Sequence, residues 1–204
     1  MKKTAKVMAE KKGIDKDVAI FMDNANDGDY DGIVEIYTNY HNHEKLLTYK
    51  NQRAAATALH LAANNGHVEI VQFLVNKICM DFPAQRSDLI NAKNKFFFTP
   101  LICACFRGYL TKGKANECQD ERLEIVRCLL QNGADVAYAT PDTHMTAAHW
   151  AAYNKDENVV RELLRSGAPH GKFSHMDRLP IDVAGSSRAF DCVDKFLNSY
   201  YGTI

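Results

Sequence analysis

The stretch that decides the fold is TALHLAANNGHVEIVQFLV, residues 57–75. Its first part begins with Thr57, is rich in small Ala residues and ends near Gly66. Its second part places apolar residues at helical spacing. A Thr hydroxyl can cap a helix at its start, and a Gly interrupts a helix. We therefore expect two short helices joined by a turn, the first of which can approach its neighbours closely.

The same pattern recurs further along the chain. Neither helix of a unit is long enough to bury its apolar face alone, so neighbouring units must stack to form a shared core. In the second and third units, Gly133 and Gly167 follow the second helix and are expected to end it. The recurring segments are TPLICACFRG with LEIVRCLLQNGADV (99–108 and 123–136), TAAHWAA with VVRELL (146–152 and 159–164), and the more divergent LPIDVAG with FDCVDKFL (179–185 and 190–197).

The stretches at 57–75 and 99–136 resemble ankyrin repeats, whose unit is about 33 residues of β-turn plus two helices. The resemblance covers about residues 18–198. It implies an all-α fold, an ankyrin-repeat solenoid of stacked helix-turn-helix units joined by β-turn or hairpin loops. We expect a basic N-terminal tail (1–16) and a single repeat domain (17–204), made of a cap at about 18–50 and repeats at about 51–90, 91–136, 137–169 and 170–204.

Two insertions distinguish this chain from a regular array. Thr57 and Thr99 are 42 residues apart and Thr99 and Thr146 are 47 apart, whereas Thr146 and Leu179 are 33 apart. The extra residues fall mainly in 77–90 and 109–122, which are polar. We expect both segments to be surface loops.

Composition excludes several classes of protein. Lys plus Arg and Asp plus Glu are both 25, so no net charge draws the chain to nucleic acid or to a membrane. The longest apolar run, residues 96–106, is too short to span a bilayer, and the N-terminus lacks the apolar region of a secretory signal. The six cysteines have no regular spacing, which favours a reducing intracellular compartment. We expect a cytoplasmic protein, with association with the cytoskeleton as one option.

The charge is uneven, because residues 1–13 hold five Lys and one Glu. Two interpretations of this tail stay open. It binds an acidic partner, RNA or anionic lipid, or it is a solvated extension.

Residues that suggest chemistry have structural explanations. His60 and His149 match the His of the family's Thr-Pro-Leu-His motif, and the resemblance implies that they link neighbouring repeats. Cys103 and Cys105 would point about 200° apart on a helix, so they cannot bind one metal ion and are expected to be buried. No phosphate-binding loop, nucleophile motif or zinc motif is found. We expect no enzyme activity, no catalytic residue, no metal and no cofactor.

The resemblance also implies where a partner binds, because ligands of ankyrin proteins usually lie along a concave groove of turn tips and inner helices. The residues expected in this groove combine cationic, aromatic and Met side chains. They are Lys93, Lys95, Phe96, Phe98, Phe106, Arg107, Met145, Tyr153, Phe173, His175 and Met176.

The run KNKFFFT, residues 93–99, is the most informative part of this groove. The family usually has Asp and Gly at the tip of the turn, whereas this chain has Phe96 and Phe97. Three consecutive Phe residues in a turn cannot all face one core, so at least one ring should be exposed, as interface anchors are. The alternative is that residues 77–90 fold over these rings and bury them.

The leading functional interpretation is a non-catalytic protein–protein interaction module. It would serve as a small adaptor or scaffold, or as an accessory subunit of a larger cytoskeletal, ciliary or organellar assembly. A reversible inhibitor or regulator that masks a partner protein is the first alternative. An alternative of another class is the targeting arm of an enzyme. Nucleic acid is not expected as a partner.

Overall fold

The computed structural model describes residues 15–106 and 119–169. The lysine-rich tail, most of the insertion at 109–122 and the whole fourth repeat therefore lie outside the described residues. So do four of the expected groove residues, Arg107, Phe173, His175 and Met176.

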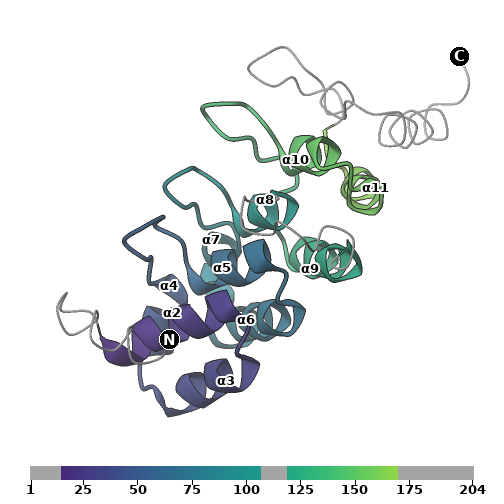
Figure 1. Cartoon of the computed structure of the whole chain (residues 1–204). Helices are drawn as coiled ribbons and strands as arrows, with labels where there is room; N and C mark the ends of the chain where they lie inside the picture. Colours follow the sequence, from purple (N-terminus) through teal and green to yellow (C-terminus); the bar gives the residue numbers. More distant parts are fainter. Residues whose placement is uncertain (1–14, 107–118, 170–204) are drawn as a thin grey trace, which may run out of the picture.

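Paired helices stack in two rows, which confirms the expected all-α solenoid (Figure 1). Residues 15–106 and 119–169 contain no strand, only one isolated bridge between Ala139 and Thr146. The inner row is α2 (Lys16–Asp27), α5 (Ala58–Asn65), α8 (Pro100–Cys105) and α10 (Ala147–Tyr153). The outer row is α3 (Tyr30–Asn39), α6 (Val68–Asp81), α9 (Gln119–Gln131) and α11 (Glu157–Arg165). Short elements α4 (His43–Thr48), η1 (Pro83–Gln85) and α7 (Arg86–Ile90) lie between the units.

Each inner helix after α2 begins at the Thr that the pattern identifies. The hydroxyl of Thr99 accepts a hydrogen bond from the amide of Ile102 at 3.3 Å. Thr57 and Thr146 form capping boxes, in which the His three residues later also accepts the backbone N–H of the Thr. The turn after α5 depends on Gly66, whose φ of 84° lies in the left-handed region. The local signals of the repeat therefore act as predicted.

One continuous core runs between the two rows. The Ala residues of the inner helices are buried, which lets successive units pack closely. Cys103 and Cys105 are buried in the same core, as expected. The largest side chains that are fully buried include Phe21, Ile33, Leu46, Leu74, Ile90, Leu101, Ile125, Leu129 and Leu163.

The prediction that residues 77–90 form a surface loop was wrong. Helix α6 continues to Asp81, and η1 and α7 complete the segment. The physical reason is apolar spacing, because Ile78 lies one turn beyond Leu74 on the buried face of α6, and Leu89 and Ile90 are also buried. The polar residues of the segment cover a helical extension of the core.

The end of the second insertion also differs from expectation, because residues 119–122 begin helix α9. Asp120 and Glu121 lie in its first turn, where negative charge favours a helix N-terminus. Arg122 is buried and donates from Nη1 to the carbonyl oxygen of Ala104 at 2.7 Å. This bond ties α9 to the inner helix α8.

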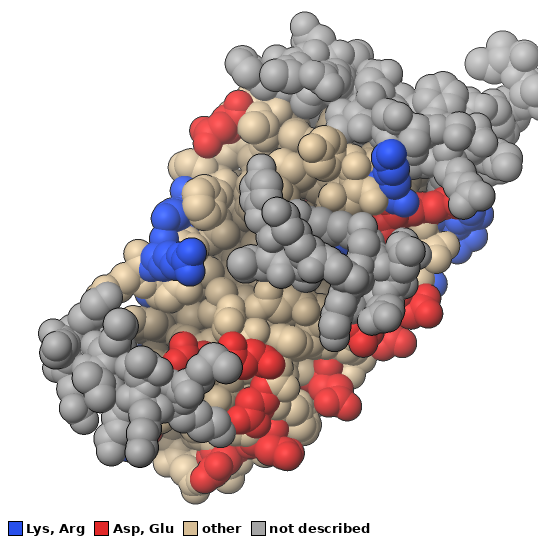
Figure 2. Space-filling view, viewed as in Figure 1, with Lys and Arg blue, Asp and Glu red and all other residues tan. Residues whose placement is uncertain are grey.

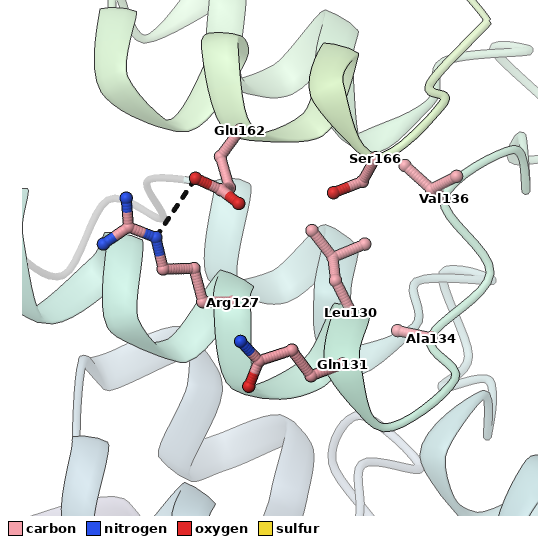
Figure 3. Close-up of a pocket in the computed structure, with 7 residues that line it drawn as sticks. All are labelled: Arg127, Leu130, Gln131, Ala134, Val136, Glu162 and Ser166. Carbon is pink, nitrogen blue, oxygen red and sulfur yellow. Dashed lines mark hydrogen bonds and ion pairs between the residues drawn. The ribbon is translucent and has the colours of Figure 1, made fainter.

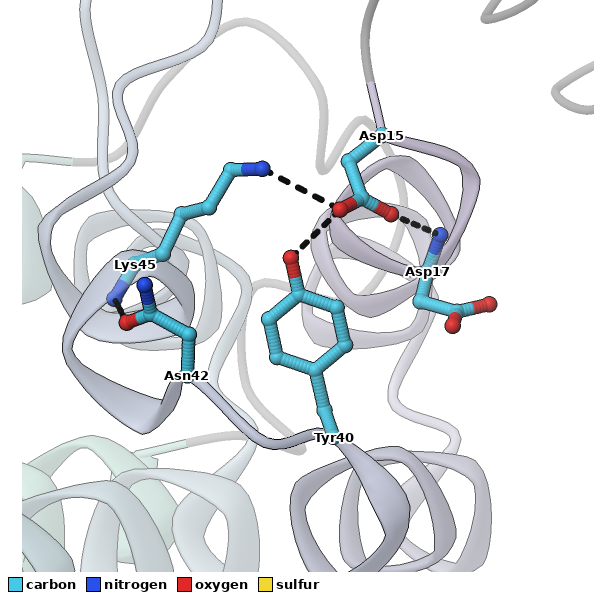
Figure 4. A network of polar contacts seen from close by, with 5 residues as sticks. All are labelled: Asp15, Asp17, Tyr40, Asn42 and Lys45. Atoms are coloured by element: carbon cyan, nitrogen blue, oxygen red, sulfur yellow. Dashed lines mark hydrogen bonds and ion pairs between the residues drawn. The ribbon is translucent and has the colours of Figure 1, made fainter.

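A small polar network fixes the N-terminal end of the stack (Figure 4). Tyr40 Oη donates to Asp15 Oδ2 at 2.5 Å, and Lys45 Nζ lies 3.1 Å from the same oxygen. Asp15 also caps α2, because its Oδ1 accepts from the amide of Asp17. The hydrogen bond from Tyr40, with smaller contributions from Lys45, holds the pKa of Asp15 below its ordinary value. The last two residues of the expected tail (1–16) therefore belong to this cap.

Candidate partner-binding surface

Three turn tips project from one side of the stack, before α5, α8 and α10 (Figure 1). In the second tip, the amide of Asn94 donates to the carbonyl oxygen of Phe98 at 3.0 Å. Asn94 Oδ1 accepts from the amides of Phe96 and Phe98 at 2.9 and 3.0 Å. Asn51 organises the first tip in the same way. The side chain of one Asn thus fixes the backbone of each of these two tips.

The residue two positions before each capping Thr has a left-handed backbone. Its φ is 48° at Ala55, 59° at Phe97 and 54° at His144. This conformation favours Gly, and a bulky side chain in it is strained. Phe97, at the tip where the family usually has Asp and Gly, thus has a positive φ.

The three consecutive Phe side chains face different surroundings. Phe96 is 54% exposed and Phe97 is 42% exposed, whereas Phe98 is half-buried against the core. The expectation that at least one ring faces solvent is confirmed. The exposure also contradicts the alternative in which residues 77–90 bury these rings.

Five rings from two adjacent repeats form one surface, which we call the aromatic surface. The ring centroids of Phe106 and Trp150 are 4.7 Å apart in an edge-to-face arrangement. Phe98 contacts both of these rings, at 5.2 and 5.6 Å, and extends the surface to Phe96. Tyr153 continues it at 6.2 Å from Trp150 and is 61% exposed. Met145 is half-buried in the third tip, and the structure gives it no contact with these rings.

Trp150 belongs to this surface although the sequence reasoning missed it. It lies four residues after Thr146, where the other units have Leu61 and Cys103. The signal that could have found it is its spacing, because Trp150 and Tyr153 lie three apart on one face of α10. Its Nε1 is buried and has no hydrogen-bond partner in the part of the chain that the structure describes.

Cationic side chains lie at the first two tips, and one of them, Lys95, contacts Phe96 of the aromatic surface. We call Lys50, Arg53, Lys93 and Lys95 the basic rim. Of these, Lys50 and Arg53 were not among the predicted site residues. Figure 2 shows one group of Lys and Arg at the edge where the tips project and others at the upper right of the same face, whereas Asp and Glu lie mainly along the right edge and over the N-terminal helices. On α2, burial and the neighbouring charge of Asp27 raise the pKa of Asp23 above its ordinary value.

His60 supports the second tip from below. Its Nδ1 accepts the amide of Thr57 at 3.2 Å, and its Nε2 donates to the carbonyl oxygen of Phe98 at 3.0 Å. Burial lowers the pKa of His60 from 6.5 to about 4, so the ring is neutral at pH 7. The expected role of this His as a link between repeats is confirmed.

The described residues do not form an arrangement that suggests catalysis. Burial raises the pKa of Cys103 to about 12 and also raises that of Cys105, so neither thiol is activated. Within residues 15–106 and 119–169, no three metal-binding side chains come together. Among the helices described, none has the length and apolar character needed to cross a membrane.

A hollow away from the tips lies between outer helices α9 and α11 (Figure 3). Its volume is about 220 Å³, and Arg127 Nε pairs with Glu162 Oε2 across it at 3.1 Å. Leu130 and Val136 supply apolar lining. None of the predicted site residues lines it.

Comparisons with known proteins agree with the fold. Two family models match the chain, one described as "Ankyrin repeats (3 copies)" over residues 21–114 and one as "Ankyrin repeats (many copies)" over residues 117–164. Together they cover both parts of the chain that carry the aromatic surface.

Three curated proteins illustrate the similarity. Neurogenic locus notch homolog protein 1 of Xenopus tropicalis is 30% identical over 54% of this chain and 4% of its own length. Ankyrin repeat-containing protein YAR1 of Saccharomyces cerevisiae is 38% identical over 31% of each chain. Putative E3 ubiquitin-protein ligase XBAT31 of Arabidopsis thaliana is 25% identical over 70% of this chain and 29% of its own length. The chain thus spans less than a third of each of these relatives.

Proposed function

This chain belongs to the ankyrin repeat family, whose repeats are protein–protein interaction modules, and from that premise we propose that it binds a partner protein through its turn tips and inner helices. We further propose that it does so as a non-catalytic adaptor or scaffold, or as an accessory subunit of a larger assembly. The larger assembly that we propose is a cytoskeletal, ciliary or organellar complex.

The observation that carries this proposal is the exposed aromatic surface. Phe96 and Tyr153 are each more than half exposed, although the core is complete without them. Large exposed rings next to cations are typical of the residues that dominate binding at protein interfaces. Phe97 keeps a bulky side chain at a strained position, which folding alone does not require.

Two alternatives remain with their own tests. A reversible regulator would mask a partner through the basic rim, and moderate salt would release it, because salt screens exposed charges. A permanent subunit would remain with its complex through high salt. A targeting arm of an enzyme is the other alternative, and it is prompted by the name of the XBAT31 relative.

We propose an intracellular, cytoplasmic location. The support is the chemistry of the cysteines, because Cys79, Cys103, Cys105 and Cys128 are free thiols. Free thiols of this kind suit a reducing compartment.

The test is affinity capture from a native extract, with binding quantified for two single variants. F96A and Y153A each remove an exposed ring, and each should weaken partner binding by more than about 1 kcal/mol, or at least about fivefold. M80A is the matched control, because Met80 is 68% exposed on outer helix α6. Equal capture by all three variants and the wild type would contradict the proposal.

A further inference from the structure

We propose that the partner segment bound at this surface is an acidic peptide stretch. Its carboxylates would lie on the basic rim, and an adjacent apolar residue would pack on the aromatic surface. One of its acceptor oxygens would take the hydrogen bond of Trp150 Nε1. This inference rests on the proposed function and names the chemistry of the partner.

The basic rim is a rigid unit made by two tips. The amide of Lys95 donates to the carbonyl oxygen of Ala54 at 2.9 Å, which joins the second tip to the first. Lys50 Nζ donates to the carbonyl oxygen of Lys93 at 2.9 Å, and Lys95 Nζ donates to that of Arg53. These bonds hold the cations in place before a partner arrives, which reduces the entropy lost on binding.

The rim cations form no ion pair in the described parts of the chain. The ion pairs found there are Lys45–Asp15, Arg127–Glu162 and Arg161–Glu157. Instead, Lys93 Nζ lies 4.6 Å from the ring centroid of Tyr138, and Lys95 Nζ lies 4.9 Å from that of Phe96. Each ammonium group retains hydrogen-bond donors for an anionic partner.

Trp150 adds a requirement for an acceptor. Its indole N–H is buried among rings that offer no acceptor, and a buried donor without a partner is unfavourable. Because side chains at interfaces commonly change rotamer on binding, the rings that cover this N–H would shift so that a carbonyl or carboxylate oxygen of the bound peptide reaches it. The neighbouring rings of Phe106 and Tyr153 would contact the apolar part of the same segment.

The charge on the rest of the face favours a peptide over nucleic acid. Helices α2 and α3 carry Asp17, Asp23, Asp27, Asp31 and Glu35, and Figure 2 shows Asp and Glu gathered over the N-terminal helices. A nucleic acid carries a regular row of phosphates and needs a longer basic track. A peptide with a few carboxylates fits the short rim and avoids the acidic helices.

The test begins with a random-peptide display library selected against the full chain. The enriched peptides should contain several Asp or Glu residues next to an apolar or aromatic residue. K93E/K95E should weaken binding of a selected peptide by about tenfold at low salt, and by less at high salt. The control K16E/R165E changes the net charge equally at exposed positions away from the rim, and it should leave affinity within about twofold.

The role of Trp150 is tested on the same peptide. W150F keeps an aromatic ring but removes the N–H, so affinity should fall about fivefold while thermal unfolding shows a folded protein. Y30F, on outer helix α3 away from the aromatic surface, serves as its control, with affinity changed less than about twofold.

The contradicting outcomes are distinct. Enrichment of basic or uncharged peptides, no enrichment at all, or equal affinity of K93E/K95E and the wild type would overturn the acidic-peptide inference. A single-stranded oligonucleotide that displaces the selected peptide and binds more tightly would favour nucleic acid. If F96A and Y153A still weaken capture of a partner protein, the proposed function holds even when one of these outcomes overturns the acidic-peptide inference.

Discussion

The first and second turn tips have the same backbone design but different side-chain chemistry. Asn51 and Asn94 each accept two amide hydrogen bonds, and the residues at Ala55 and Phe97 have the same left-handed conformation. In the three positions before its capping Thr, the first tip has Ala54, Ala55 and Ala56, whereas the second tip has Phe96, Phe97 and Phe98. The Asn residues and the left-handed positions therefore determine the backbone of a tip, whereas the side chains at its end determine what the tip can bind.

The inner helices repeat this division. Thr57 and His60 make the same capping box in α5 as Thr146 and His149 make in α10. At the next exposed position along the groove, however, α5 has Asn64, whereas α10 has Tyr153. Changes at the capping-box positions should alter the stability of the fold in either repeat. Changes at the groove positions should alter partner binding only where the residue is aromatic.

The largest expected effect is at His60, on the scaffold side of the comparison. H60A removes the buried acceptor of the Thr57 amide and one of the two donors to the carbonyl of Phe98, and it creates a cavity. We expect the free energy of unfolding to fall by about 4 kcal/mol, measured by urea denaturation. N64A in the same helix is the control, with a change below about 0.5 kcal/mol. If H60A lowered the free energy of unfolding no more than N64A does, the distinction between scaffold positions and binding positions would be contradicted.

The second expected effect is a pH dependence carried by the same residue. The pKa of His60 is about 4 in the folded protein and 6.5 in the unfolded chain, so the unfolded state binds the proton more readily between these values. His60 therefore contributes full stability above pH 6.5, and about 3 kcal/mol of it is lost as the pH falls to 4. The stability difference between the wild type and H60A should shrink by this amount over the same range. A constant difference would contradict the assignment.

A smaller effect is expected at the left-handed positions of the two tips. F97G and A55G each relieve a strained backbone, and each should stabilise the fold by about 0.5–1 kcal/mol in thermal or urea unfolding. Phe97 is 42% exposed, so the burial lost with its ring offsets part of the gain at F97G. F97G should also weaken partner capture, whereas A55G should not. Destabilisation by F97G alone would mean that the ring serves the fold.

Local signals in the sequence predicted the scaffold well. The capping Thr residues, Gly66 and the His60 link act through neighbours close in sequence or through a recurring motif. The helical form of residues 77–90 was missed because it depends on burial of Ile78, Leu89 and Ile90 against other units. Polar composition alone could not reveal that burial.

The candidate site was predicted only in part, for a similar reason. Phe96, Phe98, Phe106 and Tyr153 were identified, but Trp150 was not, because its role depends on rings from the preceding repeat. Lys50 was missed because it joins the rim through a bond to Lys93, 43 residues away. Partner binding by all the predicted residues stays a prediction, and Arg107, Phe173, His175 and Met176 also lie outside the described residues.

The most direct test of the central claim uses the single Trp of the chain. A ¹⁵N–¹H spectrum of the labelled full chain contains one indole signal, which reports on Trp150 Nε1. Addition of the captured partner protein should shift this signal, because the partner covers the aromatic surface and accepts the hydrogen bond. An indole signal that stays in place while the partner is bound would show that binding occurs elsewhere and would contradict the account.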